Sequence, residues 1–496
     1  MREQSRDVVI IGSGPTGSAY ARIIRRDWPE ARILMIEAGP QIMPQIGAHL
    51  DNVVDLEERG ALETLAQGGD RTPRTPISKE EWEARRAGGF DASQLRRSGL
   101  FIANDADPTE SLFAGFSAAN VGGMGTKWST GTPTPSQAER VPFIARDELD
   151  RAIALGEELL GTNKDPRAGD ATAHALREKL GAVFNRGRTP DRFVQPMPLA
   201  ATPQADGSLR YHGTDVVLGP MVDEAPERFR ILAETVCRRI VHKDGRVSGV
   251  ELARPGETET AFVAAGTVIV ACDALHTPQL LHASGIRPAA LGRYLNDHYI
   301  ISQISEMSTD TPMRAMSWIP STDEFPYSVT IAPASLNTMP VSGDMTGQPI
   351  GMGLFVPGDI SADNRVVFDD SKLDWKGLPA ISIQWRQSDA DKKRLEAAKE
   401  LALGISHLIG RPAPGFATIV LPVGSSLHYQ GTIRMGEADD GTSVCDRNSR
   451  VWGFDNLYVA GNGVIPTVTA TNPTLYSVAL ATIGARQIAR ERRSVA

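Results

Sequence analysis

The sequence has few of the features that mark secreted, membrane or metal-binding proteins. Its 496 residues include only three cysteines, and no two of them form a CxxC pair. This predicts neither a disulfide framework nor a cysteine zinc site, and we expect no other metal site. No apolar stretch approaches the roughly 18 residues of a membrane span, and no signal-peptide hydrophobic region precedes the first expected strand. We therefore expect a soluble protein of the reducing cytoplasm, with no membrane partner.

An excess of basic charge is also absent. The 52 Lys and Arg residues are outnumbered by 60 Asp and Glu residues, which gives a net charge of -8. Such a chain does not attract phosphate backbones, and no run of Lys and Arg is interleaved with aromatic residues, so we expect no nucleic-acid partner. With 41% hydrophobic residues the chain can bury a large core. At about 150 residues per domain, we expect two domains.

A glycine-rich turn near the N-terminus is the first informative motif. It follows an apolar strand at residues 8–11 and opens an expected helix at residues 15–26. The spacing GxGxxG lets backbone amides approach a pyrophosphate at the N-terminus of that helix. The candidate cofactor-binding residues of this turn are Gly12, Gly14, Thr16 and Gly17.

The next expected strand, at residues 32–39, contains an acidic residue whose position is informative. Glu37 follows Gly17 by 20 residues, where a carboxylate accepts hydrogen bonds from an adenosine ribose. Strand, turn, helix and acid together predict a dinucleotide site. The alternative is a tight turn with a surface glutamate, and the motif alone does not separate FAD from NAD.

A second glycine turn lies more than 400 residues further along the chain. In residues 456–466 an apolar strand leads into Gly461 and Asn462, shortly before a C-terminal helix. Flavoproteins of this architecture hold the middle of FAD at such a turn. The helix is expected to begin at Pro473 and Thr474, where free amides and the positive end of the helix dipole can stabilise negative charge on a reduced flavin. The two turns together favour FAD.

A third glycine-rich run, at residues 120–131, is short and weakly charged. Its backbone can approach a planar ring closely and leave amides directed at ring heteroatoms. The candidate cofactor contacts are Gly123, Met124, Thr126, Lys127 and Trp128. The alternative is a loop that needs glycine only for positive φ angles.

The remaining segments indicate how the chain is organised. Residues 41–110 are charged and lack periodicity, which predicts long loops and short helices near the cofactor or at a subunit contact. A helical stretch is expected at residues 145–184. Residues 229–252 predict strands around a turn at residues 243–246, similar to the small sheet that covers adenine in flavoproteins, with Val236 as a candidate contact.

Residues 300–415 differ in residue pattern from the preceding part of the chain and contain no nucleotide-binding motif. Strands at residues 365–368 and 381–385 and a helix at residues 389–409 predict a sheet-based substrate domain. The stretch at residues 307–325 is either a loop that gates the site or a surface connection.

This order of motifs resembles the glucose–methanol–choline oxidoreductases, and among them the pyranose oxidase branch with its bacterial relatives that oxidise sugars and C-glycosides. The resemblance rests on the first turn, on residues 122–128, 276–281 and 292–298, and on residues 424–489. It implies an α/β fold with a Rossmann-like FAD-binding domain and a sheet-based α+β substrate domain. We assign the FAD-binding domain to residues 1–150, 210–300 and 420–496, and the substrate domain to residues 151–209 and 301–419.

Two candidate catalytic residues follow from the C-terminal part. Oxidation of an alcohol needs a base for the hydroxyl proton, and histidine is suited to that role near neutral pH. The resemblance aligns His428 with the family's catalytic histidine and Asn472 with a residue that faces the substrate. Asn472 also precedes Pro473, so its side chain has the alternative role of helix cap. His276, His282 and His298 are expected only to brace loops.

In fungal pyranose oxidases the glycine-rich run carries a histidine that is bonded covalently to the flavin. This chain has Lys127 between Thr126 and Trp128 instead, so the departure implies noncovalent FAD. Lys127 itself is either close to the ring or an ordinary solvated lysine.

The expected reaction is FAD-dependent oxidation of a ring hydroxyl of a sugar or glycoside to a ketone. Oxidation at C3 is favoured, as in a C-glycoside 3-oxidase, and a pyranose 2-oxidase or a pyranose dehydrogenase is the alternative. The electron acceptor is O2, giving H2O2, or a quinone, and a homo-oligomer is possible. An FAD-carrying lyase, an NAD-dependent dehydrogenase and a non-catalytic binding protein with a flavin fold remain further alternatives.

Overall fold

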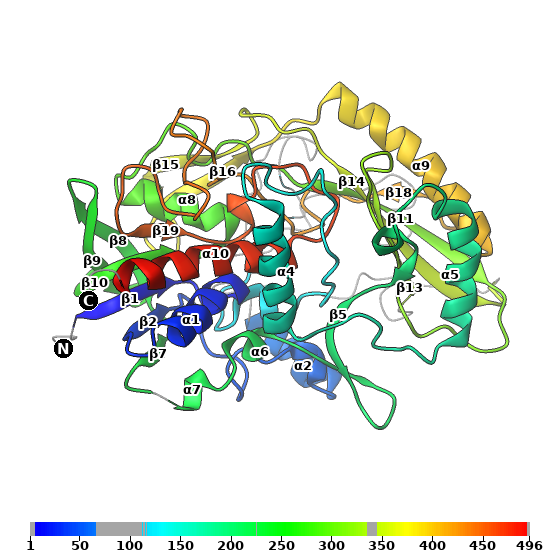
Figure 1. Ribbon diagram of the computed structural model, residues 1–496, viewed down its shortest axis with the longest axis horizontal. Helices are drawn as coiled ribbons and strands as arrows, with labels where there is room; N and C mark the ends of the chain where they lie inside the picture. The colour runs from blue at the N-terminus through cyan, green and yellow to red at the C-terminus, as the bar shows by residue number, and fades with distance from the viewer. Residues whose placement is uncertain are drawn as a thin grey trace.

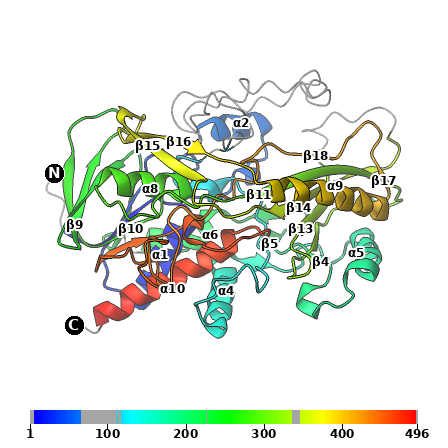
Figure 2. The ribbon, with the colours of Figure 1, turned by 90° about the horizontal axis from the view of Figure 1, so that it is seen from above.

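The computed structural model describes residues 5–65, 112, 115, 117–224, 226–334 and 345–493. In these residues the chain forms two sheets of seven strands, which lie toward opposite ends of the long axis (Figures 1 and 2). The expected loops and short helices of residues 41–110 lie outside the described residues from residue 66 onward.

The first sheet is built around β1 (Arg6–Ile11). Its parallel neighbours are β2 (Ile33–Ile36) and β10 (Ala261–Val270), and β7 (Phe229–Leu232) and β19 (Leu457–Val459) extend it in parallel on the two sides. The last four residues of β1 form a continuous apolar run, and each is at most 4% exposed. Such a run is typical of a parallel strand that is covered on both faces.

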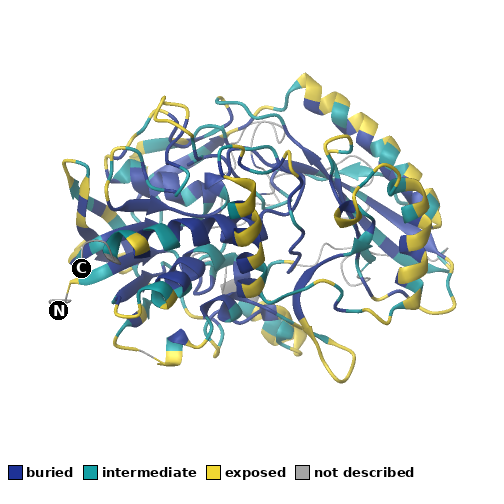
Figure 3. Cartoon of the chain, viewed as in Figure 1, coloured by how far each residue is buried: buried dark blue, intermediate teal, exposed yellow. Residues whose placement is uncertain are grey.

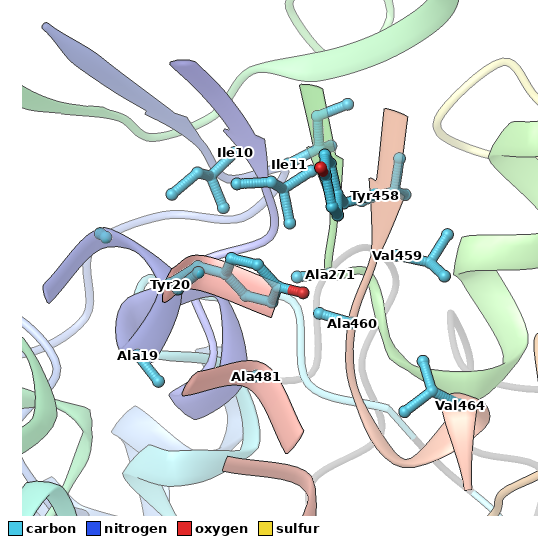
Figure 4. Packing of buried hydrophobic residues seen from close by; sticks show 14 of the residues in the cluster. Ile10, Ile11, Ala19, Tyr20, Ala271, Tyr458, Val459, Ala460, Val464 and Ala481 are labelled. Atoms are coloured by element: carbon cyan, nitrogen blue, oxygen red, sulfur yellow. The ribbon is translucent and has the colours of Figure 1, made fainter. Parts of the chain in front are cut away.

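Helices from the two ends of the chain pack together over this sheet. α1 (Pro15–Asp27) contacts α10 (Thr474–Arg493), which also contacts α4 (Arg146–Leu160). The helices approach closely at Tyr20, which Figure 4 shows among small residues of the strand ends and of α10. A Cβ atom on Gly484 would lie only 2.1 Å from the Tyr20 hydroxyl, so this crossing requires a residue without a side chain.

A pair of antiparallel strands continues the first sheet beyond β10. β8 (Val236–Lys243) and β9 (Arg246–Ala253) form a hairpin, and β9 pairs with the N-terminal half of β10. The turn of this hairpin lies where the sequence predicts it. The expected strand across residues 231–236 is interrupted, because the chain bends at Glu234, whose φ is 48°.

The second sheet is largely antiparallel and has the order β17-β11-β14-β13-β12-β4, with β18 paired to β11. Its strands are β11 (His298–Met307), β14 (Gln348–Pro357), β13 (Ser328–Pro333), β12 (Ser317–Ile319), β4 (Gln195–Pro196), β17 (Arg411–Pro412) and β18 (Ile419–Val420). The stretch at residues 307–325 therefore includes β12, and Trp318 in this strand is buried and donates a hydrogen bond to the Ser328 hydroxyl.

α9 (Asp389–Ile409) covers the second sheet. Its buried residues Leu395, Ala398, Ala402 and Ile405 recur at helical spacing, and Figure 3 shows its exposed side turned outward. The Ser388 hydroxyl and the Asp391 carboxylate cap its N-terminus reciprocally. The sequence predicts the bounds of this helix correctly.

The remaining elements are short helices, a hairpin and a three-stranded sheet. They are η1 (Leu50–Asn52), α2 (Leu56–Leu65), η3 (Gly123–Thr126), β3 (Thr162–Asn163), α5 (Ala171–Phe184), η4 (Pro190–Arg192), β5 (Leu199–Pro203), β6 (Leu209–Tyr211), α6 (Thr214–Leu218), α7 (Met221–Glu224), α8 (Asp273–Ala283), β15 (Arg365–Leu373), β16 (Pro379–Gln384) and η5 (Asn462–Val464). No helix in the described part of the chain is both long and apolar enough to cross a membrane.

The helical stretch expected at residues 145–184 is two helices, α4 and α5. Gly161 ends α4 with a left-handed φ of 62°. α4 packs against α10 beside the first sheet, although it lies mostly in residues 151–209 of the expected substrate domain. The domain boundaries remain a prediction.

Candidate active site

A cavity of about 440 Å³ is lined by residues from both ends of the chain. Of the candidate residues, those that line it are Gly12, Gly14, Thr16, Glu37, Gly123, Met124, Lys127, Trp128, Val236, His428, Gly461, Asn462, Asn472 and Thr474. Gly17, Thr126 and Pro473 do not line it. The topology explains the convergence, because the carboxyl ends of parallel β1, β2, β10 and β19 meet at one edge of the first sheet.

The first glycine turn needs its glycines for two different reasons. Gly12 has a φ of 103°, and a Cβ atom on it would lie 2.2 Å from the Ala271 carbonyl oxygen. A Cβ atom on Gly14 would meet nothing within 4 Å, so this position faces open space in the cavity wall. Gly17 allows close packing instead, because a Cβ there would lie 2.3 Å from the Gly12 carbonyl oxygen.

Glu37 lies at the end of β2 and is fixed by the first turn. Its Oε2 accepts hydrogen bonds from the Ser13 amide (3.2 Å) and hydroxyl (2.7 Å), and its Oε1 accepts one from the Gly39 amide at 3.1 Å. Burial raises the pKa of this carboxyl group above its ordinary value. The remaining acceptor capacity of the carboxylate is available to hydroxyl groups of a ligand in the cavity.

The third glycine run forms η3, which lies against the first turn. The Gly122 amide donates to the Ser13 hydroxyl at 2.9 Å, and Gly122 and Gly123 both have positive φ angles. Thr126 is buried in this turn and donates to the Gly123 carbonyl at 2.9 Å. Its role in the structure is therefore to hold the turn, whereas the neighbouring Lys127 lines the cavity.

The cavity lining includes residues that sequence reasoning missed. Trp375 and Lys376, in the turn between β15 and β16, line the cavity together with Val236. The Lys376 ammonium group is held by Gln279 Oε1 (3.0 Å) and Asp374 Oδ2 (3.3 Å). No signal in the sequence indicates that this hairpin turn reaches the strands of the first sheet.

His428 lies across from a second histidine. Its Nδ1 atom is 2.6 Å from Nε2 of His298, and the two rings are perpendicular. Burial lowers the pKa of His298 to about 4, and burial together with His298 lowers the pKa of His428 well below its ordinary value. His298 Nδ1 lies 3.2 Å from the Thr469 carbonyl oxygen, which agrees with the expected bracing of a loop, and its ring also contacts the candidate base directly.

The other two histidines differ in their surroundings. His276 Nδ1 is 2.9 Å from Asp273 Oδ2, which also accepts from the Ser117 hydroxyl, and all three residues line the cavity. His282 lies outside the cavity lining, 2.9 Å from Asp370.

Asn472 does not use its side-chain oxygen to cap α10. Its Oδ1 atom is buried and has no hydrogen-bond partner among the described residues, and the side chain lines the cavity. The preceding loop is fixed by buried Glu139, which accepts hydrogen bonds from the amides of Ala470 (2.7 Å) and Thr471 (2.8 Å). An unpaired buried acceptor at the cavity wall indicates that a ligand supplies the missing donor.

These features fit a flavin dinucleotide. The cavity lining includes glycine turns at the N-termini of α1 and η3, a fixed carboxylate at the end of β2, an imidazole and an amide oxygen. Among the described residues, no group of three or more His, Cys, Asp and Glu side chains is placed to hold a metal ion.

Comparison with known proteins gives a consistent result. Residues 213–300 and 361–481 match family models described as GMC oxidoreductase. The chain is 40% identical over 508 residues to a C-glycoside 3-oxidase of Microbacterium trichothecenolyticum, covering 98% of this chain and 96% of that protein. It is 28% identical over 541 residues to a pyranose 2-oxidase of Tricholoma matsutake, covering 97% and 93%.

Solved structures show the same fold. The crystal structure of pyridoxine 4-oxidase from Mesorbium loti has a TM-score of 0.65 at 20% identity and covers 97% of this chain and 99% of that chain. A formate oxidase of Aspergillus oryzae has a TM-score of 0.67 at 14% identity, with full coverage of both chains.

Proposed function

Since the chain belongs to the glucose–methanol–choline oxidoreductase family, we propose that it oxidises a secondary ring hydroxyl of a sugar or glycoside to a ketone. Members of this family are FAD-dependent oxidoreductases. The observation that supports the proposal most is that one cavity is lined by the imidazole of His428, by the unpaired amide oxygen of Asn472 and by the glycine turns. A base and a polar group for orientation are what alcohol oxidation requires of a protein.

The two residues have complementary roles. His428 accepts the proton of the substrate hydroxyl, and its lowered pKa keeps the imidazole neutral and ready for this at neutral pH. Asn472 orients the substrate through its free Oδ1 atom. FAD supplies the acceptor for the hydride that leaves the carbon. Replacing His428 by alanine is expected to lower kcat about 10²- to 10⁴-fold.

The flavin is proposed to be noncovalent. Lys127 lines the cavity at the position where the fungal enzymes carry their flavin-linked histidine, and a lysine ammonium group does not provide that imidazole linkage. The test is denaturation of the purified protein followed by filtration. Yellow colour that passes the filter supports the proposal, whereas colour that stays with the polypeptide contradicts it.

Oxidation at C3 is favoured because two C-glycoside 3-oxidases align with nearly the full chain at 40% and 39% identity. Pyranose 2-oxidases align at 28% identity or less, which makes oxidation at C2 the second candidate. Both groups of relatives are named oxidases, so O2 is the proposed acceptor and H2O2 the second product. A quinone acceptor and a homo-oligomeric state are further possibilities to be measured.

The decisive experiment combines a flavin spectrum with product analysis. Anaerobic addition of a C-glucoside or glucose should bleach the oxidised-flavin absorbance near 450 nm, and NMR of the aerobic product should show a 3-keto sugar. A 2-keto product would favour the pyranose 2-oxidase alternative. Yellow protein that no sugar bleaches would indicate a lyase or a binding protein, and colourless protein would indicate a nicotinamide enzyme.

A further inference from the structure

The two histidines of the site are brought together by strand register. Asn296 and Gln430 form an antiparallel bridge with reciprocal backbone hydrogen bonds of 3.0 and 2.9 Å. His298 lies two residues after Asn296 and His428 lies two residues before Gln430, so this antiparallel bridge brings the two residues across from each other. Such cross-strand pairs are the closest side-chain neighbours in a sheet. The contact between the imidazoles thus follows from the backbone.

The hydrogen bonds determine which ring nitrogens carry protons. His298 Nδ1 lies 3.2 Å from the Thr469 carbonyl oxygen, which can only accept, so His298 must carry its proton on Nδ1. In the neutral ring, Nε2 of His298 is then an acceptor. The proton in the 2.6 Å contact between the rings therefore belongs to Nδ1 of His428. The remaining nitrogen of His428, Nε2, is left with a free lone pair.

This arrangement directs the lone pair to the cavity. His428 lines the cavity and His298 does not, so Nδ1 of His428 is turned away from the ligand space toward His298. Nε2 makes no hydrogen bond to any described residue. The His298 ring is buried and the His428 ring is partly buried, and two imidazoles in direct contact away from bulk water do not both carry a charge.

The Thr469 carbonyl that starts this chain of hydrogen bonds is held firmly. Glu139, which is buried, fixes the next two amides of the loop, and the Thr469 hydroxyl accepts a hydrogen bond from the Gln430 side chain at 2.6 Å. The carbonyl oxygen of Thr469 is thereby fixed opposite His298.

We propose that His298 is a positioning residue that fixes His428 as the tautomer protonated on Nδ1, so that Nε2 is the atom that removes the substrate proton. The inference rests on the proposed function of His428. In the reaction, the substrate O–H bond breaks and an N–H bond forms at Nε2, while Nδ1–H continues to donate to neutral His298. The second histidine thus fills, without a negative charge, the place that a carboxylate holds in a catalytic triad.

The test compares two replacements of similar length. In His298→Gln, the amide oxygen can accept from Nδ1 of His428, so the tautomer is retained. In His298→Met, the acceptor is lost and His428 can adopt the tautomer protonated on Nε2, whose Nε2 atom cannot take the substrate proton. We expect His298→Met to lower kcat about tenfold to a hundredfold with KM changed less than about twofold. His298→Gln should restore kcat to within a few-fold of the unaltered enzyme.

A second measurement reads the tautomer without turnover. The protein is labelled with ¹⁵N-histidine, and the signals of His428 are identified by their loss in His428→Asn. At pH 7.5 the spectrum of the holoenzyme should show His428 neutral and protonated on Nδ1. The His298→Met variant should shift the ring toward protonation on Nε2. Flavin content and melting temperature are measured on each variant to establish that it is folded.

The outcomes separate this inference from the proposed function. If His428→Asn is as active as the unaltered enzyme, the proposed function fails. If His428→Asn is inactive but His298→Met keeps its kcat, the proposed function stands and the positioning role is overturned. A His428 ring that is protonated on Nε2 in the unaltered enzyme overturns it as well.

Discussion

Asp297, the neighbour of His298 in the sequence, provides a quantitative test of the site's electrostatics. The residue is 3% exposed, and its Oδ1 accepts hydrogen bonds from the Ser426 hydroxyl and from the His298 amide at 2.9 Å. Its Oδ2 has no partner among the described residues. Burial raises the pKa of this carboxyl group from 3.8 to about 7. The perturbation is Asp297→Asn, which removes the charge and keeps an oxygen that can accept both hydrogen bonds.

The direction of the effect follows from linkage. Because the folded-state pKa is raised, the ionised form is disfavoured by folding. The penalty is absent below the unfolded pKa of 3.8 and complete once the pH exceeds about 7. With these two values it is about 2 kcal/mol at pH 5 and about 4 kcal/mol at pH 8. The variant avoids this penalty, so its stability relative to the unaltered enzyme should rise by about 2–3 kcal/mol between these pH values.

The expected change in melting temperature can be stated. A chain of 496 residues has an unfolding entropy of about 1 kcal/mol/K, at about 2.1 cal/mol/K per residue. The difference in Tm between variant and unaltered enzyme should therefore increase by about 2–3 °C from pH 5 to pH 8. Replacement of exposed Asp310 by Asn is the control. Differential scanning calorimetry at pH 5 and pH 8 measures the Tm of each protein.

The test is how the Tm difference changes between the two pH values. Whether the variant is more or less stable at one pH is less informative, because its amide nitrogen also lacks a partner at the position of Oδ2. A Tm difference that is constant with pH, or that falls as pH rises, would refute the assignment of a buried carboxyl with a raised pKa. Flavin content and turnover of the variant should remain, since the Ser426 and His298 contacts are kept.

Four further predictions concern binding and catalysis. Because the pKa of His428 is lowered, the acidic limb of the kcat/KM profile should lie below pH 6.5, and a limb at pH 7 or above in steady-state assays would contradict the buried neutral base. Gly12→Ala should give colourless protein, since its Cβ would lie 2.2 Å from a backbone oxygen; an unchanged ratio of 450 to 280 nm absorbance would be evidence against this. Asn472→Ala should lower kcat/KM about 10- to 100-fold through the lost acceptor, and an effect below twofold would exclude this role. Trp375→Ala should weaken FAD binding to the apoprotein by roughly tenfold, or about 1.4 kcal/mol, in a fluorescence titration. An unchanged affinity would show that the β15–β16 hairpin does not contribute to FAD binding.

The parts of the fold that are encoded locally could be predicted from the sequence. The apolar run of β1, the glycine turn after it and the helix that follows are contiguous, and each constrains the next through backbone sterics. The helix at residues 389–409 is equally clear, because its cap and its apolar spacing are both present in the sequence. The prediction of FAD rests on two glycine turns, because the first turn alone does not separate FAD from NAD.

The features that were missed depend on contacts between distant segments. His298 and His428 are 130 residues apart, and their rings come together where the backbone bridge at Asn296 and Gln430 joins the two segments. The position of Lys376 depends likewise on how the β15–β16 hairpin crosses α8. The helical stretch at residues 145–184 is predicted without its division into two helices, because Gly161 alone does not reveal that it adopts a left-handed φ.

The cavity takes its walls from both early and late parts of the chain, and this affects the order of events during synthesis. β1 and its turn leave the ribosome first, but β19, the turn at Gly461 and the N-terminus of α10 follow more than 400 residues later. Until then, the nascent chain has a parallel sheet without its last strand and helix α1 without the partner that covers Tyr20. Cofactor loading is therefore a late event, and chains stalled before residue 474 should remain targets for chaperones and proteases.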